Sequence, residues 1–236
     1  AGGAYTVDNA YAIMAEVGSV VAHNTISGMR GNGIEKGALI NNNTITNGKN
    51  GIVADLTATI TNNTLVNDPA TTNGFAISGG EVINLNTING YYAPGTSDVI
   101  SSVNLKEFKY NLIGTTTINK SLGGSILNAV KTLTTPLEFV NNTFSNNQYK
   151  NNHIRLSSDN MTIADNTIEN DYDDTNAETI LATGGLMAPY PTADGTGTAL
   201  YIKLKDANAL MQRNIITGHK GNIKGAALYI EATTPL

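Results

Sequence analysis

The sequence predicts an all-β protein: a single right-handed parallel β-helix, or solenoid, of roughly nine coils with a few loop insertions. Three observations support this prediction. A short motif centred on asparagine recurs along most of the chain, short apolar runs flank its copies, and Asn, Thr and Gly occupy the place that Lys and Glu hold in helical proteins. These residue types disfavour helices and favour turns and strands.

The recurring motif is an Asn followed by a small or apolar residue and then an apolar residue. Its copies are centred on eight asparagines: Asn24, Asn43, Asn63, Asn86, Asn111, Asn142, Asn166 and Asn214. They lie 19, 20, 23, 25, 31, 24 and 48 residues apart, and such a period is typical of a solenoid that makes one coil per repeat. Because the last interval is twice 24, we expect a coil without the motif near residues 178–198.

Each motif predicts a corner in the chain. Ile60 and Leu65 are five positions apart, so in an unbroken strand they would point to opposite faces. For both to enter the core, a residue between them must bend the chain. We expect Asn63 to do so, because Asn tolerates the left-handed conformation. Stacked coils would then place the eight asparagines in a column about 4.8 Å apart, with their amides hydrogen-bonded along it.

A second pattern, Asn-Gly followed by a short apolar run, precedes most motifs. Examples are Asn32-Gly33-Ile34, Asn50-Gly51-Ile52-Val53 and Asn73-Gly74-Phe75-Ala76-Ile77. Gly and Asn mark turns, and the apolar run after them has the length of a strand. We therefore expect each coil to contain an Asn-Gly corner, a strand, a turn, a second strand, the asparagine corner and a third strand.

Residues 41–52, which read NNNTITNGKNGI, resemble the right-handed β-helix repeats of the pectin lyase-like superfamily. The resemblance covers most of residues 10–232 as architecture. The superfamily includes polysaccharide lyases, hydrolases and epimerases, and also adhesin, tailspike and surface-layer solenoids. It implies the fold, but similarity of fold alone does not decide the activity.

Composition narrows the class of partner and the compartment. The chain has 236 residues, a net charge of −5 and 14 basic residues without a basic run, so we expect no nucleic-acid partner. No apolar stretch approaches the length of a membrane span, so we expect no membrane insertion. Cysteine is absent, which excludes disulfides and thiolate metal sites. We expect an extracellular or cell-surface protein in which residues 1–236 form one β-helix domain or a fragment of a longer solenoid.

One acidic segment suggests a metal site. Asp171, Asp173 and Asp174 lie in a predicted loop, where alternate carboxylates can converge on a calcium ion, which takes six to eight oxygen ligands. The resemblance to β-helix lyases implies the same ion, which those enzymes hold against an acidic sugar. The alternative interpretation is a solvated acidic loop. The sequence suggests no other cofactor.

Four basic residues suggest a surface that contacts carbohydrate. His153 and Arg155 alternate with Leu156, and Lys203 and Lys205 alternate with Leu204, so each pair is expected to face outward from its strand. If the strands stack, the four side chains form a cationic stripe that can contact an acidic sugar. The alternative is a row of solvated charges that prevents edge-to-edge pairing.

Arg213 and His219 form a second basic candidate for carbohydrate contact. Their segment, RNIITGHKG, is similar to a Gly-His-Gly element of polygalacturonases, but Lys220 stands where the second Gly is expected. The paired carboxylates that glycoside hydrolysis requires would have to be Asp173 and Asp174, outside their usual context. The alternative is a polar corner with exposed cations.

Three tyrosines are candidates for stacking on sugar rings. Tyr91, Tyr92 and Tyr190 lie in predicted loops. An exposed phenol ring combines a large apolar face with a polar tip, which suits contact with carbohydrate.

We expect a structural or adhesive solenoid that contacts surface polysaccharide or associates with itself, laterally or end to end. Regular coils, 14% charged residues and the lack of a convergent catalytic set favour this function. The ends show no clear cap, which suggests pairing of ends between copies or a truncated chain. The first alternative is a polysaccharide lyase, hydrolase or epimerase with its site at residues 153–174 and 203–224. The second is a receptor-binding piece of a phage tailspike.

Overall fold

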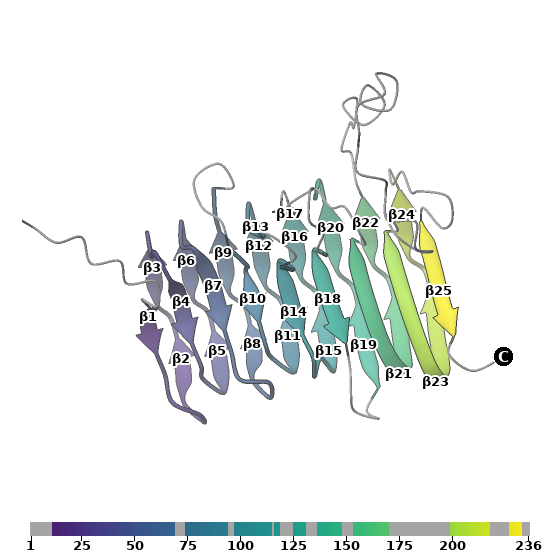
Figure 1. Ribbon diagram of the computed structural model, residues 1–236, viewed down its shortest axis with the longest axis horizontal. Coiled ribbons are helices and arrows are strands. Elements are labelled where there is room, and N and C mark those ends of the chain that lie inside the picture. The colour runs from purple at the N-terminus through teal and green to yellow at the C-terminus, as the bar shows by residue number, and fades with distance from the viewer. Residues whose placement is uncertain are drawn as a thin grey trace, which may run out of the picture.

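The chain winds as a right-handed parallel β-helix with three faces per coil. The computed structural model describes residues 11–68, 74–93, 97–114, 116–118, 125–130, 136–147, 153–169, 199–217 and 227–232. Successive coils stack along the long axis of the molecule (Figure 1) and pair in parallel on each face. The described ranges contain no helix, and the predicted fold class is confirmed.

Each face is a ladder of short strands. The first face contains β1 (Tyr11–Met14), β4 (Asn32–Glu35), β7 (Asn50–Val53), β10 (Ile77–Ser78), β14 (Ile100–Ser102), β18 (Leu127–Val130) and β25 (Leu228–Ala232). The second contains β2 (Val20–Ala22), β5 (Leu39–Asn41), β8 (Thr59–Thr61), β11 (Val82–Asn84), β15 (Glu107–Lys109) and β19 (Leu137–Val140). The third contains β3 (Thr25–Ser27), β6 (Thr44–Thr46), β9 (Thr64–Val66), β12 (Thr87–Asn89), β16 (Leu112–Gly114), β20 (Thr143–Ser145), β22 (Thr167–Glu169) and β24 (Ile215–Thr217).

Two longer strands join the first and second faces at the C-terminal end. They are β21 (Ile154–Ala164) and β23 (Leu200–Gln212), and their register shifts between Ser158 and Asn160. A separate pair, β13 (Tyr92–Ala93) and β17 (Thr117–Ile118), forms its own two-stranded parallel sheet.

The core is a set of aliphatic columns, one from each face. Along the third face, Ile26, Ile45 and Leu65 are stacked in register and buried. Ile60 and Leu65, five positions apart, both enter this core with no exposed surface, as predicted. In the two coils that contain Asn111 and Asn142, phenylalanines replace aliphatic residues in these columns. The ring centroids of Phe108 and Phe139 are 5.6 Å apart, and those of Phe139 and Phe144 are 6.0 Å apart.

The eight asparagines form the predicted column inside the corner between the second and third faces. Asn43 Nδ2 donates to Asn63 Oδ1 at 3.0 Å, and Asn63 Nδ2 donates to Asn86 Oδ1 at 3.0 Å. Each Oδ1 also accepts the backbone N–H of the preceding asparagine in the column. The contacts continue through Asn111 and Asn142 to Asn166, so the amide ladder is confirmed.

The residue that bends the chain is not the ladder asparagine, and this part of the prediction is wrong. The left-handed residue is the one before it: Asn62 has a φ of 54°, and Leu85 and Tyr110 have φ angles of 59° and 57°. The full set of these corner residues, here called the corner column, is His23, Asn42, Asn62, Leu85, Tyr110, Asn141, Asp165 and Arg213. The bend turns the ladder side chain inward, where its amide satisfies buried backbone groups.

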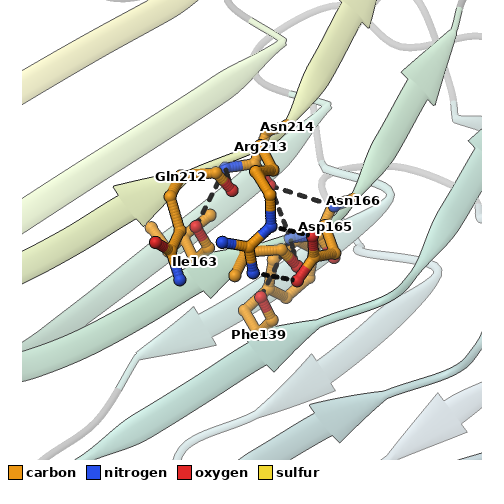
Figure 2. Close-up of polar contacts among 8 residues, drawn as sticks. Phe139, Ile163, Asp165, Asn166, Gln212, Arg213 and Asn214 are labelled. Atoms are coloured by element: carbon orange, nitrogen blue, oxygen red, sulfur yellow. Dashed lines mark hydrogen bonds and ion pairs between the residues drawn. The ribbon is translucent and has the colours of Figure 1, made fainter.

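The prediction of an extra coil near residues 178–198 is also wrong. Asn166 Nδ2 donates directly to Asn214 Oδ1 at 2.8 Å (Figure 2), and β21 pairs with β23. The 48-residue interval therefore separates successive coils. Within the described ranges the ladder spans eight coils, and β25 begins a ninth.

The corner column offers a direct test of backbone strain. A left-handed conformation costs an ordinary residue about 1–2 kcal/mol, and glycine avoids most of this cost. We expect Leu85→Gly to raise the free energy of unfolding by roughly 0.5–1 kcal/mol, because part of the relief is offset by the greater freedom of unfolded glycine. Urea denaturation measures the change. A loss of stability in this variant would show that Leu85 is not strained.

Candidate binding surface

The corner column runs along the outside of the solenoid and carries mostly polar residues. Backbone N–H groups link it from coil to coil: Asn62 donates to Asn84 O, Leu85 donates to Lys109 O and Tyr110 donates to Val140 O. Consecutive members therefore lie one strand spacing apart, about 4.8 Å. Because each ladder asparagine points inward, the residues on either side of it face outward together.

An apolar cluster interrupts this polar surface at the middle of the solenoid. Leu85, Tyr110 and Leu112 expose 50%, 56% and 48% of their surface. Leu85 and Tyr110 are neighbours in the corner column, and Leu112 lies two residues beyond Tyr110, across the inward-pointing Asn111. We call these three residues the apolar platform.

Short polar side chains surround the apolar platform. Leu112 sits between Thr87 and Thr143 in the register of the third face. In the corner column the platform is flanked by Asn62 and Asn141, both exposed. The platform is therefore bordered on both sides by hydroxyl and amide groups.

The charged residues beside the apolar platform are paired with one another. Lys109 Nζ forms ion pairs with Glu107, at 3.3 Å, and with Glu138. Its hydrogen bond to Glu138 is the main cause that raises the pKa of Lys109, with a smaller contribution from Glu107. Lys106 is paired with Glu81. Both lysines on this side of the platform, Lys106 and Lys109, are therefore paired with glutamates.

The C-terminal end of the corner column holds another ion pair, which involves the predicted contact residue Arg213. Its Nε donates to Asp165 Oδ1 at 2.6 Å and its Nη2 donates to Asp165 Oδ2 at 2.7 Å (Figure 2). This contact lowers the pKa of the Asp165 carboxyl. Arg213 is exposed, and two of its N–H groups already contact this carboxylate.

Two residues predicted to contact carbohydrate are buried, so these predictions are wrong. His153 has no exposed surface, and its ring makes a T-shaped contact with that of Phe144, with the two ring centroids 5.4 Å apart. It lies just before β21, where the first-face corner turns two consecutive residues inward, as it does at Val99 and Ile100. Simple strand alternation therefore fails at this position.

Tyr91 is also buried, because its segment continues the solenoid wall. It lies in the core, close to Gly51, where an added Cβ would come within 3.1 Å of the phenol oxygen. Burial raises its pKa. The following residue, Tyr92, begins β13 and is half-buried.

Two members of the predicted cationic stripe face outward. Arg155 is exposed on β21 and Lys203 is half-buried on β23, next to Ser157 in the register. They lie two positions apart on adjacent coils of the first face. The side chain of Lys205 falls outside the described residues, as do Tyr190, His219 and the proposed calcium ligands Asp171, Asp173 and Asp174. Elsewhere in the described part of the chain no group of three metal-binding side chains occurs.

Arg155 lies in the electrostatic field of a half-buried carboxylate, Asp98. Ser125 N donates to Asp98 Oδ1 at 2.7 Å and Asn128 Nδ2 donates to Asp98 Oδ2 at 2.9 Å. Burial raises the pKa of Asp98, against the opposing effects of these hydrogen bonds and of Arg155. Asp98 occupies the same position in its coil as Asn50 does in an earlier one, because each lies two residues before the inward isoleucine of its strand. Asn50 Oδ1 likewise accepts a backbone N–H from the next coil.

We expect Asp98→Asn to preserve the corner and change the pH dependence of stability. The new amide keeps the acceptor for Ser125, and rotation of Asn128 can present its Oδ1, which has no partner within the described residues. Since the folded-state pKa of Asp98 is raised, the wild type should lose stability relative to the variant as the pH rises through that value, and keep the deficit at neutral pH. Urea denaturation between about pH 3 and 7 measures this.

The exposed carboxylate of Glu16 supplies the control for this experiment. Glu16→Gln makes the same carboxylate-to-amide change at an exposed position. A wild type that instead gains stability relative to Asp98→Asn as the pH rises would contradict the assignment of a burial penalty to Asp98.

Searches of protein-family models, curated proteins and solved structures found no match to the chain. In the described ranges there is also no helix long and apolar enough to cross a bilayer. The function of the candidate surface is therefore inferred from the geometry of its residues.

The apolar platform was missed by sequence reasoning. Tyr110 and Leu112 flank Asn111 inside a copy of the repeat, so their pattern indicates repeat positions and not a site. A signal was present, because most other copies have Asn, Asp or His before the ladder asparagine and Thr after it. The copy at residues 107–115 has Tyr and Leu instead.

Proposed function

We propose that the chain is an extracellular adhesive or structural solenoid of the pectin lyase-like type, and that its outer surface contacts a surface polysaccharide. The observation that carries this proposal is the register of the third face. Thr25, Thr44, Thr64 and Thr87 occupy the same outward position on four successive coils. Farther along, Thr143 and Thr167 share that position.

A repeating surface suits a repeating ligand. On the four successive coils from Thr25 to Thr87 the hydroxyls lie about 4.8 Å apart, so these coils can contact successive units of an extended polymer. Individually weak contacts that act along one chain combine into high avidity. The buried asparagine ladder supports the same role, because its hydrogen bonds between successive coils from Asn24 to Asn214 stiffen the rod that carries this surface.

A panel of immobilised neutral and acidic polysaccharides tests the proposal. We expect retention of the purified chain on at least one of them, without release of new reducing or unsaturated ends, in the presence or absence of calcium. Electron microscopy of the same material tests lateral association. Product release would favour an enzyme, and a chain that neither binds nor assembles would contradict the proposal.

A polysaccharide-active enzyme is the second candidate, and Arg155 is the observation that favours it. Arg155 is exposed on the first face, with Lys203 on the adjacent coil. The resemblance to β-helix lyases implies an arginine or a lysine as the catalytic base. Under this alternative the product assay is positive and Arg155→Ala abolishes it. Activity that survives Arg155→Ala would remove Arg155 from the site.

A further inference from the structure

The apolar platform combines two unfavourable features at one place on the solenoid. Leu85 and Tyr110 hold left-handed backbone conformations with φ angles of 59° and 57°, which are unfavourable for residues with bulky side chains. About half of each side chain is also exposed to water. Asparagine meets the backbone requirement at Asn62 and Asn141 in the same column. Strained, exposed apolar residues are a reason to look for a ligand.

The shape of the cluster matches the face of a sugar ring. Tyr110 supplies an aromatic surface, while Leu85 and Leu112 extend it with aliphatic carbon across two coils. A pyranose presents C–H groups on its faces and hydroxyls around its rim. The C–H groups of one unit can pack on Tyr110 while Thr87, Thr143 and Asn141 hydrogen-bond to its rim. Asn62 lies three coil spacings from Asn141 in the corner column, about 14 Å, so it can hydrogen-bond to the adjacent unit.

The local charge favours a neutral sugar over an acidic one. Lys109, the cation next to Tyr110, already holds Glu107 and Glu138. Lys106 is paired with Glu81. Together these three glutamates and two lysines carry a net negative charge, which disfavours a uronic acid at this position.

We propose that Leu85, Tyr110 and Leu112 form a docking subsite for a neutral pyranose unit of a polysaccharide, centred on the ring of Tyr110. This inference rests on the proposed function, because it names the place where an adhesive solenoid grips its polymer. The subsite lies at the corner between the second and third faces, away from Arg155 on the first face.

Affinity electrophoresis of the purified chain through gels that contain soluble neutral glucan, galactan or mannan tests the subsite, with polygalacturonate and alginate as acidic comparisons. The decisive variant is Tyr110→Asn, which matches Asn141 in the corner column and should not destabilise the backbone. We expect at least one neutral polysaccharide to retard the wild type, and Tyr110→Asn to weaken this binding roughly tenfold. The matched control is Tyr11→Asn, an exposed tyrosine on β1, which should bind like the wild type.

The outcomes separate the subsite from the general function. Retardation that is equal for the wild type and Tyr110→Asn overturns the subsite but leaves the adhesive function standing. Binding only to acidic polysaccharides overturns the choice of ligand. Binding to none overturns both the subsite and the contact with polysaccharide that it rests on. Gel filtration provides one more criterion: if Tyr110→Asn converts a dimer into a monomer, the platform is a contact between copies and the proposal is wrong.

Discussion

Replacing Asn63 by Ala is expected to lower the free energy of unfolding by about 3–5 kcal/mol. The variant removes the acceptor for Asn43 N and Asn43 Nδ2, both at 3.0 Å, and the donor to Ile40 O at 2.9 Å. Asn43 and Asn63 are almost completely buried, so water cannot replace these contacts. Each buried polar group left without a partner costs about 1–3 kcal/mol. Urea denaturation followed by circular dichroism measures the loss.

The neighbouring Asn62 gives the matched control. It has the same side chain one position earlier, but it is exposed and occupies the left-handed corner. Asn62→Gly should change stability by only a few tenths of a kcal/mol, because glycine accepts this conformation. Similar losses for both variants would mean that the ladder amide is not the stabilising group.

Replacing Phe139 by Ala is expected to cost about 3–5 kcal/mol. Its ring is fully buried and lies against Phe108 and Phe144, with centroid distances of 5.6 and 6.0 Å. Truncation would leave a cavity among stacked strands that cannot collapse, because the ladder hydrogen bonds fix the spacing between coils. The midpoint and slope of urea denaturation, compared with those of the wild type, give this energy.

Two variants show whether the loss comes from the cavity. Phe139→Leu restores much of the volume and should cost roughly 1–2 kcal/mol. Val140→Ala changes the next side chain, which points outward from β19 and is half-buried, and should cost less than about 1 kcal/mol. A Phe139→Ala variant as stable as Val140→Ala would contradict the tight packing of this layer.

The fold could be predicted because two separate features of the repeat indicate it. The spacing of the asparagines sets the length of a coil, and the separation of Ile60 and Leu65 requires a corner between them. The identity of the bent residue was harder to predict, because Asn62 and Asn63 are adjacent and both suit a bend. The other copies of the motif show which residue bends. The residue before the ladder asparagine varies from Leu to Arg, so its backbone turns while its side chain stays in solvent.

The candidate site was less predictable, because exposure depends on which face each residue joins. Alternation placed His153 outward, but the first-face corner turns it into the core beside Phe144. Tyr91 is predicted to lie in a loop, yet it fills the core. Tyr110 was hidden within a regular repeat. The local sequence pattern predicts where each strand lies. Which corner residues reach the surface becomes clear only when the coils are stacked.

The most direct test of the ladder is hydrogen exchange of asparagine side-chain amides, measured by nuclear magnetic resonance. Exposed primary amides exchange quickly, whereas buried and hydrogen-bonded ones are protected by the stability of the fold. We predict that the Nδ2 protons of Asn43, Asn63 and Asn142 persist far longer than those of their sequence neighbours Asn42, Asn62 and Asn141. Equal exchange in the two sets would contradict a buried ladder and the stacked coils built on it.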